Sequence, residues 1–134
     1  MKTIIAGGRD YRLAEADRQW LDTQGITEVV CGGCSGADTG GFDWAWSRRI
    51  PVKTIVADWK AHGKAAGHIR NAEMARYAEK CILFPGGRGT ASMRREAMKA
   101  GIPVVEAPVG RTVDSGEPVS QIGGVGRGLR PPQV

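Results

Sequence analysis

The stretch that decides the fold is Leu83-Phe84-Pro85-Gly86-Gly87-Arg88-Gly89-Thr90, which follows Cys81-Ile82 and precedes a segment rich in Ala, Met and Arg. It predicts a short buried strand, a glycine turn and then a helix. Glycines have no Cβ, so backbone N–H groups can approach a ligand closely. Thr90 is a candidate cap for the helix, whose N-terminus favours a phosphate. A plain strand-to-helix turn is the alternative, but the glycine density favours an anion site.

The composition indicates one ordinary globular domain with an unusual number of glycines. The chain has 134 residues, of which 41% are hydrophobic and 25% charged. Its 20 glycines are about twice the average usage. A net charge of +5 and a pI near 9.4 favour anionic partners, which include nucleotides, phosphates and nucleic acid. Charge alone does not separate these classes.

The three cysteines and the lack of long apolar runs indicate a reduced, cytoplasmic protein without a membrane partner. Cys31 and Cys34 have CxxC spacing. A zinc site would need four ligands, and the further ligands are missing from the pattern, so we expect no metal and no cofactor. A redox pair is an alternative to small residues at a tight strand end.

Strand and helix patterns alternate along the chain, with connections too long for hairpins. They predict an α/β fold: a Rossmann-like, doubly wound parallel sheet of about five strands, with helices on both faces and strand order 3-2-1-4-5. The predicted strands are Lys2–Ala6, Thr27–Cys31, Val52–Ala57, Lys80–Phe84 and Pro103–Glu106. The predicted helices are Tyr11–Gln24 with Asp10 as cap, about 37–49, about 65–78 and Thr90–Ala100, with a loop at Asp58–Lys64.

A change of character after residue 106 divides the chain into a domain at 1–106 and a tail at 107–134. The tail is rich in Gly and Pro and has almost no periodic apolar pattern. Its composition predicts a flexible arm. An arm docked on a neighbouring subunit or a ligand is the alternative.

Three glycine turns should meet at the carboxyl edge of the sheet, the usual ligand site of open α/β folds. In them Ser35 could donate to a phosphate, Asp38 could bind a ribose diol or activate a water, and the arginines could bind phosphate bidentately. Trp59 could stack on a base. Each also has a plain structural explanation. The candidate nucleotide-binding residues are Gly7, Gly8, Arg9, Gly33, Ser35, Gly36, Asp38, Trp59, Arg70, Asn71, Pro85, Gly86, Gly87, Arg88, Gly89 and Thr90.

Four ordered motifs together resemble the SLOG superfamily, in particular its small YspA-like branch of bacteria and phages. They are Gly7–Tyr11, Gly32–Asp38, Gly67–Met74 and Pro85–Thr90. The resemblance covers about residues 2–106 and implies a Rossmann-like domain that binds nucleotides or nucleotide-derived ligands, usually as a homo-oligomer. Small-residue helix faces such as Ala72, Ala75 and Ala78 could pack in a dimer. Among related branches, LOG enzymes cleave the N-glycosidic bond of nucleoside monophosphates and DprA binds single-stranded DNA.

The resemblance assigns catalysis in LOG enzymes to an arginine and a glutamate. Arg70 matches the arginine, but Met93 stands where the glutamate would be. Asp38 or Glu96 could substitute, although neither does so by position. We therefore predict a nucleotide sensor or sequestering module, with an N-glycosidic hydrolase that uses Arg70 and either carboxylate as the alternative. Single-stranded nucleic acid is the least favoured partner, because aromatic residues are few and basic residues alternate with acidic ones.

Overall fold

The computed structural model describes residues 1–32 and 37–108 and divides the chain into two compact units. The first unit comprises Met1–Arg12 and Ile26–Glu106. The second comprises Leu13–Gly25 and the chain from Ala107 onward. The predicted tail from residue 109 on lies outside the described residues. Each unit is taken by itself below.

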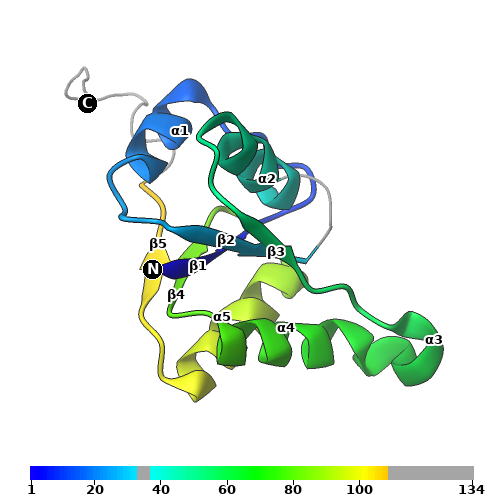
Figure 1. Ribbon diagram of the computed structural model, residues 1–134. Helices are drawn as coiled ribbons and strands as arrows, with labels where there is room; N and C mark the ends of the chain where they lie inside the picture. The colour runs from blue at the N-terminus through cyan, green and yellow to red at the C-terminus, as the bar shows by residue number, and fades with distance from the viewer. Residues whose placement is uncertain (33–36, 109–134) are drawn as a thin grey trace. The chain divides into compact units, whose positions relative to one another are not determined.

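The first unit is built on one parallel sheet of five strands in the order β3-β2-β1-β4-β5, as the sequence predicts (Figure 1). Central β1 pairs with β2 on one side and with β4 on the other; Ile4 lies opposite both Val30 and Cys81. The strands are β1 (Lys2–Ala6), β2 (Glu28–Cys31), β3 (Val52–Thr54), β4 (Lys80–Leu83) and β5 (Val104–Glu106). The helices are α2 (Ala37–Ser47), α3 (Trp59–His62), the 3₁₀ turn η1 (Gly63–Ala65), α4 (Ala66–Tyr77) and α5 (Arg88–Ala100).

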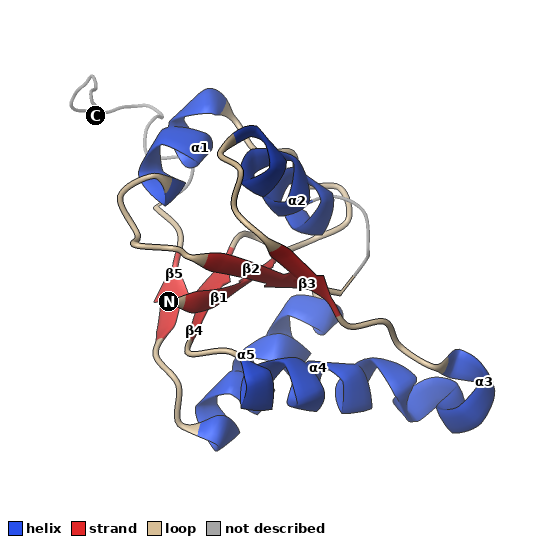
Figure 2. Ribbon diagram, in the orientation of Figure 1, coloured by secondary structure: helices blue, strands red, loops and turns tan. Residues whose placement is uncertain are grey.

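Helices cover both faces of this sheet: α2 lies on one face, and α4 with α5 on the other (Figure 2). On the α2 face, a Cβ at Gly41 would lie 2.9 Å from Ile5, so glycine lets helix and strand approach closely. The opposite face buries a hydrophobic core, and each fully buried aliphatic side chain there contributes about 1.5–3 kcal/mol. This core contains Ile4, Ala6, Val30, Ile55, Met74, Ala75, Ala78, Cys81, Leu83, Met93 and Ala97.

The second unit contains helix α1 (Glu15–Leu21), which is shorter than the predicted Tyr11–Gln24. Ala14 has an extended backbone, and its N–H donates to the carboxylate of Asp17 at 2.8 Å, which fixes the start of the helix. The prediction that Asp10 caps this helix was wrong, since the chain has not yet entered it at that point. Tyr11 is instead held in a turn, where its N–H donates to Gly8 O.

Two further local predictions were wrong. Trp59 lies in the short helix α3, where a loop was predicted, because the Asp58 carboxylate accepts the N–H of Ala61 and caps the turn. Helix α5 begins at Arg88, two residues early, and its cap position is Gly87. Thr90 is consequently not a cap but the third residue inside the helix, where it is buried.

Candidate functional site

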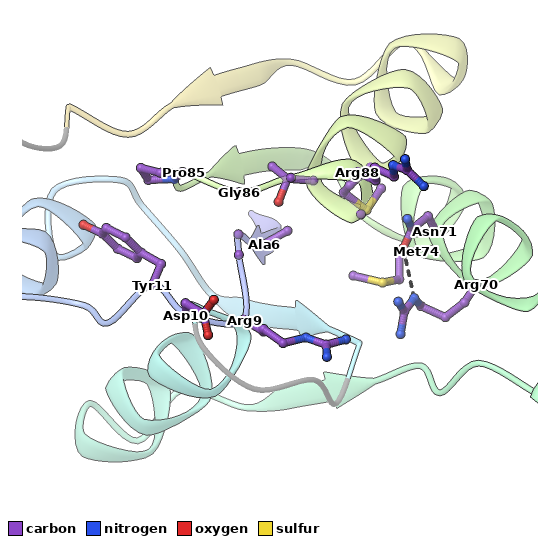
Figure 3. A pocket seen from close by; sticks show the side chains of 16 residues that line it. Ala6, Arg9, Asp10, Tyr11, Arg70, Asn71, Met74, Pro85, Gly86 and Arg88 are labelled. Atoms are coloured by element: carbon purple, nitrogen blue, oxygen red, sulfur yellow. Dashed lines mark hydrogen bonds between the residues drawn. The ribbon is translucent and has the colours of Figure 1, made fainter.

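A cavity of about 710 Å³ opens at the carboxyl ends of β1 and β4 (Figure 3). All its lining residues belong to the sheet unit. This is the point where the strand order reverses, and open parallel sheets bind ligands there. The lining consists of Ala6, Gly7, Gly8, Arg9, Asp10, Tyr11, Arg70, Asn71, Met74, Pro85, Gly86, Gly87, Arg88, Gly89, Thr90 and Met93.

Two glycine turns are joined by their main chains at the base of this cavity. The N–H of Gly8 donates to Pro85 O at 2.8 Å. A Cβ at Gly8 would lie 3.1 Å from Gly86 Cα, and one at Gly86 would overlap Thr90 Oγ1 and approach Gly8 N to 2.6 Å. Glycine is therefore required at Gly86 by the protein itself.

The next two glycines of the second turn have no such crowding. A Cβ at Gly87 or Gly89 would meet no heavy atom within 4 Å, yet both residues line the cavity. The space beside them is open to a ligand. The same turn begins helix α5, whose first N–H groups have no acceptor within the helix and whose dipole is positive at this end. These features fit an anionic group such as phosphate.

Positive charge dominates the described part of the lining, which contains three arginines and one carboxylate. Arg9 follows β1, Arg70 lies on α4 and Arg88 begins α5, so three separate elements supply guanidinium groups (Figure 3). Arg9 and Arg88 are exposed, and neither makes an ion pair with any other residue that the structure describes. The sequence predicted all three as binding residues.

Arg70 is held from two sides. Its Nε donates to Asn71 Oδ1 at 2.9 Å, and its Nη1 donates to Gly32 O at 2.8 Å, just beyond the end of β2. A Cβ at Gly32 would overlap the guanidinium, 2.7 Å from its Cζ, so glycine leaves the room that Arg70 occupies.

Asp10 and Tyr11 line the cavity, although the sequence analysis assigned them to a helix start. The Tyr11 ring stacks on Phe84 with ring centroids 5.5 Å apart, which ties the first turn to the end of β4. Their position directly after Gly7-Gly8-Arg9 at a strand end was a signal that could have placed them here. Among the lining residues that the structure describes, Asp10 is the only carboxylate.

Met93, the residue that the resemblance to LOG enzymes aligns with their catalytic glutamate, is only 1% exposed. It packs in the core with Met74, and both also border the cavity, which gives it an apolar floor. The proposed substitute Glu96 does not line the cavity; its carboxylate lies 3.7 Å from Lys99 Nζ. No carboxylate on α5 therefore reaches this cavity.

The structure brings eleven of the candidate binding residues to the cavity and leaves Trp59 outside it. Trp59 is 61% exposed on α3 and is not a lining residue. Gly33, Ser35 and Gly36 lie outside the described residues. Asp38 belongs to α2, but its side chain is not described. The lining candidates are Gly7, Gly8, Arg9, Arg70, Asn71, Pro85, Gly86, Gly87, Arg88, Gly89 and Thr90.

Neither of the two described cysteines lines the cavity. Cys31 and Cys81 are buried free thiols, and Cys34 falls outside the described residues. Burial raises the pKa of the Cys81 thiol to about 12, which leaves it protonated at neutral pH. Within residues 1–32 and 37–108, no three His, Cys, Asp or Glu side chains gather as metal ligands would. No helix in these ranges is long and apolar enough to cross a membrane.

The suggested dimer face on α4 is wrong for two of its three residues. Ala75 and Ala78 are 1% and 6% exposed and pack in the protein's own core. Both turn toward the sheet, so they are not available to a second subunit.

Fold and cavity define a Rossmann-like α/β protein with its pocket at the switch point of the sheet. The chain belongs to the SLOG superfamily: the family model described as "YspA, cpYpsA-related SLOG family" matches residues 1–62. It is also similar to the Gene 61 protein of Mycobacterium phage D29, with 48% identity over 118 residues that cover 78% of this chain and 94% of the phage protein. No solved structure matches it.

Proposed function

We propose that the protein binds a nucleotide or nucleotide-derived ligand, either a nucleoside phosphate or an ADP-ribose-like molecule, and acts as a sensor or sequestering module. The observation that carries the proposal is the cavity at the ends of β1 and β4, where the glycine turns, the start of α5 and three arginines converge. Its volume of about 710 Å³ lies within the range of small-ligand sites.

The two ends of such a ligand find different chemistry in the cavity. Main-chain N–H groups and guanidinium groups suit phosphate oxygens. The Asp10 carboxylate can accept hydrogen bonds from ribose hydroxyls or a base amino group. The thioethers of Met74 and Met93 offer an apolar surface to a flat base.

Binding without turnover is favoured over hydrolysis by the chemistry of the lining. A glycosidase needs a carboxylate beside the bond that breaks, and loss of such an acid or base costs about 10²–10⁴ in rate. Met93 supplies none. The hydrolase alternative is kept because Arg70 and Asp10 line one cavity, so a carboxylate and an arginine are both within it.

Isothermal titration calorimetry with AMP and with ADP-ribose tests the binding. Gly89→Ala adds a methyl group where no protein atom lies within 4 Å, so it should block the ligand and not the fold. We expect at least about a tenfold loss of affinity and, because alanine is the better helix former, a gain of up to about 0.5–1 kcal/mol in stability.

Gly67→Ala is the matched control, because Gly67 is also the second residue of its helix but does not line the cavity. Its Cβ would make an ordinary contact of 3.6 Å with Trp59. It should show the gain in stability and unchanged affinity. Absence of binding by the wild type, or equal binding by Gly89→Ala, contradicts the proposal. Release of free base on liquid chromatography would replace it with the hydrolase.

A homo-oligomer also remains a proposal. The contacts of α4 described above do not support it.

A further inference from the structure

Beside the cavity, a hydrogen-bond network of four side chains and one carbonyl connects the residue after β2 with α4 and α5. It runs from Gly32 O through Arg70 and Asn71 to Ser92, and ends at His68. Ser92 and His68 do not line the cavity. They were not predicted as site residues, so their role in this hydrogen-bond network needs its own explanation.

The orientation of the Asn71 amide follows from what its neighbours can do. Arginine only donates hydrogen bonds, so the atom that faces Arg70 Nε at 2.9 Å must be the amide oxygen. The amide nitrogen then donates to Ser92 Oγ at 3.1 Å. If the amide turned over, two donors would face each other at Arg70.

Ser92 completes this arrangement in the core between α4 and α5. Its side chain is 2% exposed and Asn71 is 5% exposed, so water does not replace either partner. His68 Nδ1 lies 2.7 Å from Ser92 Oγ, and His68 sits one turn before Asn71 on α4. Ser92 can accept from Asn71 while its own hydrogen goes to His68 Nδ1, or accept from both residues when Nδ1 carries a hydrogen. In each case Asn71 keeps the same orientation.

We propose that Ser92 and His68 are positioning residues that lock Asn71 and thereby hold the Arg70 guanidinium in the orientation that binds the ligand's anionic group. This inference rests on the proposed function. An arginine held in advance loses less side-chain freedom when a phosphate binds. Gly32 contributes by leaving space for the guanidinium.

The first test needs no ligand. The Nε–H signal of Arg70, identified in ¹⁵N NMR spectra by its loss in Arg70→Met, should exchange slowly with solvent in the wild type. In Ser92→Ala the exchange rate should rise about tenfold. The buried amide of Asn71 then has no acceptor at residue 92 and no longer holds Arg70 in one orientation. Alanine is smaller than serine and favours helix, so the variant should fold. Unchanged exchange would overturn the proposal.

The second test measures AMP and adenosine affinities by calorimetry in a double-mutant cycle. Ser92→Ala should lower the affinity for AMP about tenfold and leave the affinity for adenosine unchanged. In the Arg70→Met background the same change should have less than about a twofold effect. Equal losses for AMP and adenosine, or additive effects, would mean a general structural role and overturn the proposal.

His68 supplies a matched pair at an exposed position. His68→Asn keeps a polar atom near the place of Nδ1 and should retain wild-type AMP affinity. His68→Leu removes that atom and should lower AMP affinity, as Ser92→Ala does. Equal AMP affinity in His68→Leu and the wild type removes His68 from the proposal. If the wild type does not bind AMP, the proposed function fails. If the Arg70 Nε–H nevertheless exchanges faster in Ser92→Ala than in the wild type, the positioning role stands.

Discussion

The two edges of the parallel sheet use their polar groups in opposite ways. At the amino edge the groups bind one another: the Tyr77 hydroxyl donates to the Glu28 carboxylate, and Lys2 N donates to Glu79 Oε1 at 2.8 Å. The Lys2 ammonium also lies 4.5 Å from the centre of the Tyr77 ring. At the carboxyl edge, Arg9 and Arg88 face a cavity. These amino-edge groups hold the fold together, whereas Arg9 and Arg88 line a cavity and form no ion pair with another described residue.

This comparison predicts that substitutions at the two edges separate stability from binding. Amino-edge changes should lower the melting temperature and leave affinity alone. Most carboxyl-edge changes should weaken ligand binding and leave the melting temperature nearly unchanged. The exception is the place where the two glycine turns touch, because the same atoms there serve both purposes.

The largest effect is expected at that exception, from Gly86→Ala. Its Cβ would collide with Gly8 N and Thr90, which are main-chain and buried atoms that cannot move aside freely. We expect a loss of about 2–3 kcal/mol in the free energy of unfolding, measured in urea, together with loss of AMP binding. Gly87→Ala, one residue on and uncrowded, should stay within about 0.5 kcal/mol of the wild type. Equal stability of the two variants would contradict the tight junction.

The second effect is confined to binding. Arg88→Gln removes a guanidinium that lines the cavity and has no ion-pair partner among the described residues. AMP affinity should fall about tenfold, as for a lost charge-assisted hydrogen bond, with stability changed by less than about 0.5 kcal/mol.

Arg95→Gln is the control for this charge change. Arg95 is exposed on the same helix but does not line the cavity. Calorimetry should show wild-type AMP affinity for it. If both variants lose affinity alike, the general positive field and not the cavity attracts the ligand.

The smallest effect is expected at the amino edge, from Tyr77→Phe. The bond to Glu28 raises the pKa of Tyr77 above its usual 10.0, because that bond stabilises the protonated phenol. The stability it contributes is present below pH 10.0 and is lost as the pH rises through the raised pKa. Scanning calorimetry should show a slightly lower melting temperature for Tyr77→Phe at neutral pH, and a gap that closes in strong alkali. A constant gap, or weaker AMP binding, would contradict this role.

The sheet and most of the cavity could be predicted from the sequence because both depend on regular patterns. Alternating strands and helices leave few topologies once crossovers are right-handed. That order places the turns after β1 and β4 side by side, as the bond between Gly8 and Pro85 confirms. Glycines at strand ends then mark the site.

Helix starts and cross-helix partners could not be predicted in the same way. Thr90 matched the residue preference for a cap, but α5 begins two residues earlier, so Thr90 lies inside the helix. The Thr90 side chain packs closely against Gly86 of the turn. Ser92 looked like one small residue in an Ala-rich helix. Its role depends on how α4 and α5 pack, since Asn71 and His68 come from the other helix. Periodicity defines the faces of a helix, not which side chains meet across two of them.

The pairing of β1 has a consequence for how the protein is made. β1 is synthesised before the other strands of the sheet and can pair early with β2, but its other neighbour begins at Lys80, opposite Thr3. Gly8 has no acceptor until Pro85 has been added. Such distant contacts slow folding, because the chain between them must be ordered first. A nascent chain stopped before β4 has three of the five strands and lacks the lining residues that follow β4. The cavity can therefore take shape only after the turn that follows β4 and the start of α5 have been synthesised.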